Sequence, residues 1–207
     1  MSTITGGPSR GVRMPRDERR AQLLASALEV FVENGYHATG MDDIADRAGV
    51  SKPVLYQHFP GKLDLYLALI DTGIDEMLTH IHTALESTTD NKHRVTATVD
   101  AYFSFVEDRA GYYRLLFEND LTNEPVVAER LERLTELCAR EVSTIIGEDT
   151  GLPDEESFLL AVGLVGIAQV TARFWLRSGG SIPRATAAEL VATLEWRGIR
   201  GFPKRDA

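Results

Sequence analysis

The chain has 207 residues, a net charge of −9 and a single cysteine, Cys138. This length fits one ordinary domain or a small domain joined to a larger one, and it allows a substantial core. No run of about 18 consecutive apolar residues occurs, and the arginines near the N-terminus precede no apolar segment, so we expect neither a membrane partner nor a secretory signal. The lone cysteine excludes an internal disulfide and is typical of the cytoplasm, where we expect it to be a buried, inert thiol.

The charge is distributed unevenly along the chain. Residues 1–63 hold eight Lys/Arg and seven Asp/Glu, a balance of +1, whereas the remainder holds fourteen and twenty-four, a balance of −10, and the two sum to −9. Charges further apart than about 8 Å are largely screened at physiological salt. The acidic remainder therefore does not exclude DNA binding by the N-terminal part, which must attract phosphates.

The first predicted elements are an arm and a helix. Residues 1–14 mix Gly, Pro, Ser and Arg without periodicity, which predicts a flexible basic arm. That arm is either without a role, or Arg13 and Arg16 follow the DNA backbone or enter a minor groove. An amphipathic helix is predicted over residues 16–34, and Gly35 is expected to end it.

Residues 39–62, with the sequence TGMDDIADRAGVSKPVLYQHFPGK, carry the most informative pattern. Two short helices, 41–48 and 52–58, are predicted on either side of a turn at Gly49, with Ser51 as the N-cap of the second. This second helix is too short to bury much and presents polar side chains that can reach phosphates and base edges. The arrangement is that of a helix-turn-helix, in which one helix braces and the next enters the major groove.

Helical periodicity continues to the end of the chain. We predict a long helix from residue 62 with a bend near Gly73, a helix around 95–106, and a short helix 112–117 after a break at Gly111. Further helices are predicted from Pro125, over residues 154–177 and over residues 183–200. No alternating strand pattern competes, so the predicted fold class is all-α.

The helix-turn-helix segment resembles the N-terminal DNA-binding domain of the TetR family of one-component regulators. The resemblance covers roughly residues 16–66 and rests on matches that keep the family's order and spacing: Ala27, Phe31, Gly35, Tyr36, Thr39, Asp43-Ile44-Ala45, Ala48-Gly49-Val50-Ser51, Leu55-Tyr56, Phe59 and Lys62. It implies a DNA-binding domain over residues 15–62 and a ligand-binding and dimerisation domain over residues 63–207. Pro53 departs from the small residue common in relatives, which leaves the base preference open.

The resemblance also implies roles for individual residues. Thr39 is expected to be a phosphate-contacting cap and Lys62 a clamp on the DNA backbone. The expected DNA-contacting set on and beside the second helix is Ser51, Lys52, Val54, Tyr56, Gln57 and His58. Tyr56 could instead serve packing alone.

A ligand pocket inside the C-terminal bundle is a further implication of the family. The expected lining is Ile74, Met77, Leu78, Phe103, Leu116, Phe117 and Phe174, although any one of them could be ordinary core. This lining is apolar, which favours a lipophilic effector over a sugar or a nucleotide base. The chain is also similar to TetR-like regulators of fatty-acid synthesis that sense long-chain acyl-CoA, which would connect it to lipid metabolism.

The segment 159–175 is apolar on nearly every face, which predicts a helix buried all round. In the family, the last two helices of each subunit form a four-helix dimer interface, and this segment suits that role. The alternative is the central helix of a monomeric core. A homodimer would present two recognition helices to a palindromic operator.

The motifs of enzymes and metal sites are missing from the sequence. His80 and His82 are two residues apart, so on one helix they face different directions, and no Cys or carboxylate set completes a metal site. No phosphate-binding glycine loop, dinucleotide fingerprint or nucleophile elbow occurs, so we expect no cofactor. The sequence thus predicts a cytoplasmic, ligand-responsive DNA-binding regulator. The alternative is a helical ligand-binding or scaffold protein that has lost DNA recognition.

Overall fold

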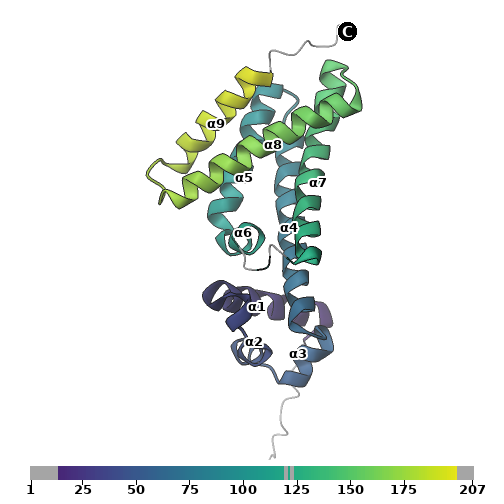
Figure 1. The fold of residues 1–207 in the computed structure, drawn as a ribbon, viewed down its shortest axis with the longest axis vertical. Coiled ribbons are helices and arrows are strands. Elements are labelled where there is room, and N and C mark those ends of the chain that lie inside the picture. The colour runs from purple at the N-terminus through teal and green to yellow at the C-terminus, as the bar shows by residue number, and fades with distance from the viewer. Residues whose placement is uncertain (1–13, 119–120, 122–123, 200–207) are drawn as a thin grey trace, which may run out of the picture.

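The computed structural model describes residues 14–118, 121 and 124–199, and within these ranges every regular element is a helix (Figure 1). Arg13, predicted to contact DNA, lies outside the described residues together with most of the predicted arm. The helices are α1 (Arg16–Ala38), α2 (Met41–Ala48), α3 (Lys52–His58), α4 (Lys62–Glu86), α5 (Asn91–Asp108), α6 (Ala110–Phe117), α7 (Pro125–Thr150), α8 (Asp154–Arg177) and α9 (Arg184–Ile199). The predicted all-α class is confirmed.

Helices α1, α2 and α3 form a small unit at one end of the molecule, with α3 furthest from α8 and α9 (Figure 1). Ile44 and Ala45 of α2 and Leu55 of α3 are buried in the core, as their helical spacing predicts. Gly49 ends α2 with φ 65° and ψ 33°, a left-handed conformation that glycine adopts without penalty. The amide of Val50 then donates to the carbonyl of Ala45 at 3.0 Å, which closes the turn into α3.

The end of α1 differs from the prediction. Gly35 has φ 76° and ψ 167°, a region that essentially only glycine occupies, but the chain resumes a short helical turn as far as Ala38. Gly35 therefore kinks α1 and does not end it.

Helix α4 runs without interruption from the unit of α1, α2 and α3 into the rest of the molecule (Figure 1). The predicted bend at Gly73 is absent. A Cβ added at Gly73 would lie 3.0 Å from Cδ1 of Tyr112 and 3.4 Å from Cδ1 of Leu116, so this glycine allows α6 to approach α4 closely. Gly111 likewise lies inside α6 against Leu28 of α1, and the predicted break falls at Arg109 instead.

Helices α5, α7, α8 and α9 complete the bundle, in which α5 and α7 pack on α4. Helix α8 packs on α7 and α9 packs on α5. The start of α9 is fixed to α5 because Arg184 forms ion pairs with Asp100 at 2.6 Å and with Glu107 at 3.0 Å. This antiparallel pairing places the end of α9 beside the start of α5.

The prediction that the segment 159–175 is buried on every side is wrong for the single chain. One side of α8 packs on the bundle, but the other carries an exposed apolar stripe that α9 continues, with Phe174 75% and Leu190 60% exposed. The large members of the stripe are Leu159, Val162, Val170, Phe174, Leu190 and Leu194. Helix α8 is also long and apolar enough to cross a membrane by length and composition, which a helix of a soluble core can equally satisfy.

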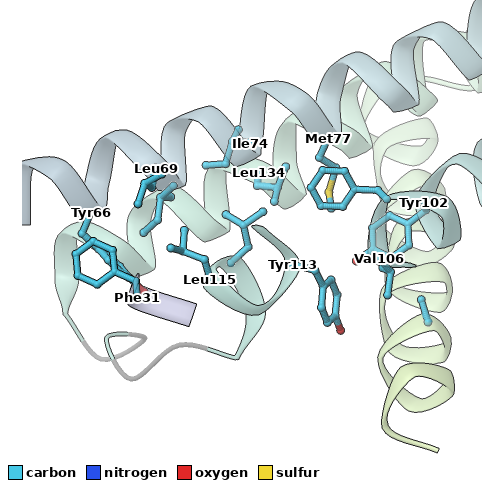
Figure 2. Close-up of a cluster of buried hydrophobic side chains, with 14 of the residues drawn as sticks. Phe31, Tyr66, Leu69, Ile74, Met77, Tyr102, Val106, Tyr113, Leu115 and Leu134 are labelled. Atoms are coloured by element: carbon cyan, nitrogen blue, oxygen red, sulfur yellow. The ribbon is translucent and has the colours of Figure 1, made fainter. Parts of the chain in front are cut away.

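One hydrophobic core extends from α1 to α9. Figure 2 shows its course along α4, with Phe31 and Tyr66 at the end near α1 and Tyr102 and Val106 at the other. The unit of α1, α2 and α3 and the bundle therefore share packed side chains.

Candidate DNA-binding surface and effector cavity

The candidate recognition surface consists of α3 and the residues next to it. Ser51, Lys52, Tyr56 and Gln57 are exposed, whereas Val54 and His58 are half-buried. Leu55 and Phe59 face the core, so the helix presents one polar side to solvent. Ser51 occupies the N-cap position, but its side chain makes no capping hydrogen bond.

Charged side chains around α3 interact with other residues of the unit of α1, α2 and α3. The Lys52 ammonium donates to Asp42 Oδ2 at 2.5 Å, and this hydrogen bond raises the pKa of Lys52. The Arg20 guanidinium lies 4.4 Å from the centre of the Phe59 ring. Arg16, predicted to contact DNA, is exposed at the start of α1. A phosphate would compete with Asp42 for Lys52, and both partners are exposed enough for that exchange.

Thr39 is buried and Lys62 is half-buried, and both side chains are bonded to backbone carbonyls, which does not fit the phosphate-contacting roles expected of them. Thr39 is 2% exposed, and its hydroxyl donates to the carbonyl of Gly35 at 2.7 Å. The Lys62 ammonium donates to the carbonyls of Tyr36 at 2.9 Å and Thr39 at 2.8 Å, and it lies 4.4 Å from the centre of the Tyr36 ring. Carbonyls at the end of a helix lack intrahelical donors and attract a cation. Here Lys62 therefore ties the start of α4 to the end of α1.

A cavity of about 380 Å³ lies inside the bundle, within the usual size range of small-molecule sites. Five helices form its wall. The lining residues are Ile81 and Leu85 from α4; Asn91, Arg94, Val95, Thr98, Val99 and Tyr102 from α5; Cys138, Val142, Ile145, Ile146, Asp149 and Thr150 from α7; Leu164, Val165 and Ala168 from α8; Glu195 and Trp196 from α9. The wall is predominantly apolar.

None of the residues predicted to line a pocket lines this cavity. Ile74, Met77, Phe103 and Leu116 are buried in the continuous core, and Leu78 and Phe117 pack against it. Phe174 belongs to the exposed stripe of α8. Helical spacing identifies inward positions, but it does not separate a residue that fills the core from one that borders a cavity.

Several ionisable residues of the cavity were not predicted to line it, and burial shifts the pKa of two of them strongly, Cys138 and Glu195. Cys138 is buried as predicted, and burial raises the pKa of its thiol to about 12. Glu195 is 5% exposed, and burial raises the pKa of its carboxyl to about 8. The only sequence signal for Glu195 is its position, since it follows Val191 and Ala192 at helical spacing on the inward side of α9.

The described residues contain no group of three or more His, Cys, Asp or Glu that could hold a metal ion. The geometry thus consists of a helix-turn-helix unit, a cavity in the bundle behind it and a helix common to both.

Comparison with known proteins agrees with this geometry. Residues 23–69 match the family model described as bacterial regulatory proteins, tetR family, and residues 80–203 match the tetracyclin repressor-like C-terminal domain. The chain belongs to the TetR family. It is 49% identical over 198 residues to the HTH-type transcriptional activator FasR of Mycolicibacterium smegmatis, with 96% of this chain and 90% of that protein covered.

Solved structures of similar fold include a TetR-like transcriptional regulator from Rhodococcus sp. RHA1, with a TM-score of 0.71 and 25% identity over 91% of this chain and 100% of that one. A second is the transcriptional regulator FadR from Bacillus subtilis in complex with stearoyl-CoA, with a TM-score of 0.66 and 18% identity over 84% of this chain and 96% of that one. This TetR-family protein is thus a DNA-binding transcriptional regulator and not an enzyme, because its family and its relatives are regulators.

The contacts between Lys62 and the end of α1 predict different effects for substitutions of Lys62 and of Lys52. Lys62→Met removes two charge-assisted hydrogen bonds between α4 and α1, so we expect it to lower the free energy of unfolding by about 1–2 kcal/mol. Lys52→Met changes an exposed side chain and should alter it by less than about 0.5 kcal/mol. Urea unfolding followed by circular dichroism measures both. Equal stability of the two variants would contradict the clamp between α4 and α1.

The raised pKa of Glu195 predicts a pH-dependent stability. Between the ordinary glutamate value of 4.5 and about 8, the folded chain retains a proton that the unfolded chain has lost, so stability decreases as pH rises through this window. Glu195→Gln does not titrate. Its stability relative to the parent should therefore increase from pH 5 to pH 8, by at most about 1.4 kcal/mol per pH unit, and level off above. Glu189→Gln, at an exposed position of α9, is the control and should show no such trend.

Proposed function

We propose that the protein is a cytoplasmic homodimer that binds a palindromic operator through α3 and responds to a lipophilic effector in the bundle cavity. The observation that carries this proposal is the cavity of about 380 Å³ whose wall includes Ile81 and Leu85 of α4, the helix that begins at the DNA-binding unit. In this proposal, residues 15–62 form the DNA-binding domain and residues 63–207 bind the effector and the second subunit.

The exposed stripe on α8 and α9 supports the homodimer. It runs along two adjacent helices, and a contiguous exposed apolar surface of this kind marks an interaction site. Added Cβ atoms at Gly163 and Gly166 of α8 would meet nothing within 4 Å, so the backbone here is open to a close neighbour. Two copies joined by this face would place two copies of α3 on one duplex, which a palindromic site requires.

Long-chain acyl-CoA is the effector class that the comparisons favour. The FadR structure of similar fold contains stearoyl-CoA, and another of similar fold is described as a fatty acid degradation regulator from Bacillus halodurans, at 18% identity and a TM-score of 0.72. The apolar wall of the cavity suits an acyl chain. These points support a role in lipid metabolism. The relative at 49% identity is named an activator, which supports positive regulation.

The dimer face predicts the outcome of a charge substitution. Phe174→Glu places a carboxylate in the stripe, where a dimer would have to bury it unpaired, so sedimentation should change from dimer to monomer. Affinity for a duplex from the region upstream of the protein's own gene should fall with it. Val126→Glu on α7 is the control, because Val126 is exposed outside the stripe. A Phe174→Glu protein that remained a dimer would remove this face from the proposal.

The effector proposal predicts that stearoyl-CoA changes the affinity for the same duplex, by roughly 5- to 150-fold, as measured by fluorescence anisotropy. Val142→Phe fills part of the cavity and should abolish the response while leaving DNA binding intact, because α7 lies apart from α3. Val126→Phe is the matched control. A response that survived Val142→Phe unchanged would place the effector elsewhere.

A further inference from the structure

Glu195 is an unusual residue for the wall of an apolar cavity. It lies on the inward side of α9, 5% exposed, and its Oε1 is buried without a hydrogen-bond partner in the described part of the chain. Burying a polar group without a partner destabilises the folded chain, and the neighbouring inward residues of α9, Val191 and Ala192, are apolar. The packing of α9 therefore does not explain a carboxyl at this position.

Arg94 of α5 is the cationic residue in the cavity wall, and it already has other partners. Its Nε donates to the carbonyls of Leu85 at 3.0 Å and Thr88 at 3.2 Å, and its Nη1 donates to Asn91 at 2.7 Å. Arg94 also lies 3.8 Å from Asp149 of α7. These contacts fasten the end of α4 to the start of α5 and balance Arg94 without Glu195.

The other cavity residues offer Glu195 no balancing cation. Helix α5 contributes Tyr102, and α7 contributes Cys138 and Asp149, none of which is positively charged at neutral pH. The lining residues from α4 and α8 are all apolar. Burial without a counter-charge raises the pKa of Glu195 to about 8, so the carboxyl is mainly protonated at neutral pH. A protonated carboxyl can donate one hydrogen bond.

The cavity has a polar end and an apolar interior. Asn91 and Arg94 come from the start of α5, and Asp149 and Thr150 from the end of α7. Glu195 lies at this same end, because α9 runs antiparallel to α5. A ligand with an apolar chain and one polar group would place its chain against Tyr102 and the α8 residues, and its polar group beside Glu195.

We propose that Glu195 is the polar anchor of the cavity, a neutral carboxyl that donates a hydrogen bond to a carbonyl oxygen on a lipophilic ligand, as in an acyl thioester. This inference rests on the proposed effector role of the cavity and adds to it the group that distinguishes the ligand's polar end. An ionised anchor would instead select a cationic lipid. A neutral anchor and an ionised anchor can be distinguished because different variants of Glu195 would retain ligand binding in the two cases.

The test compares two probes on three proteins by isothermal titration calorimetry at pH 7. The probes are palmitoyl-CoA and its thioether analogue hexadecyl-CoA, which lacks the carbonyl. The intact protein should bind the thioester roughly tenfold more tightly than the thioether, the equivalent of one buried hydrogen bond. Glu195→Gln keeps a donor of similar shape and should retain this preference, whereas Glu195→Leu should lose it. Thermal unfolding by circular dichroism confirms that each variant is folded.

The outcomes separate this inference from the function on which it rests. If the intact protein binds neither probe, the acyl effector is wrong. If it binds both but Glu195→Leu keeps the same preference, the cavity binds acyl chains and the anchor role is wrong. Hexadecylamine is titrated separately as a cationic probe. If it binds more tightly than palmitoyl-CoA and Glu195→Gln loses that binding, the anchor is ionised and the proposal is overturned. A preference that declines above pH 8 in the parent but not in Glu195→Gln is the further expected result.

Discussion

The uninterrupted helix α4 joins the two ends of this molecule. Its 25 residues span roughly 37 Å, from the Lys62 clamp on α1 to Ile81 and Leu85 in the cavity wall. Ten of its residues are buried, so it cannot slide past its neighbours without disturbing the shared core. A ligand that displaces one end of such a helix must also displace the other or deform the packing between them.

The packing between those ends includes several residues that the sequence analysis assigned to a pocket. Ile74 and Met77 of α4 and Leu116 of α6 lie in the core between the cavity and the DNA-binding unit. Gly73 and Gly111 bring α6 against both α4 and α1, because neither glycine has a side chain to hold the helices apart. These residues can therefore act in the response without touching the effector. Substitutions among them should alter how strongly the effector changes DNA affinity more than whether it binds.

Much of the fold could be predicted from the sequence, because a helical period of apolar residues is a strong local signal. The ranges of α2 and α3 and the turn at Gly49 match the prediction. The details that depend on residues far away in the sequence do not match it. The pattern predicts a helix end, a bend and a break at Gly35, Gly73 and Gly111. In the structure Gly35 is a kink inside α1, and Gly73 and Gly111 lie inside helices where another helix approaches closely. A glycine by itself does not indicate which helix will pack against it.

The candidate sites show the same division between local and distant causes. Lys52, Tyr56 and Gln57 are exposed, as a recognition helix requires, whereas Thr39 and Lys62 satisfy carbonyls at the end of α1 that no local pattern associates with them. The cavity arises where five helices fail to fill the space between them, and Glu195 borders it because α9 packs along α5, with Arg184 paired to Asp100 at the start of α9. The position of Glu195 is therefore set by the packing of the whole helix, which no pattern within α9 itself reveals. The anchor proposed for the effector thus depends on residues that are distant from Glu195 in the sequence.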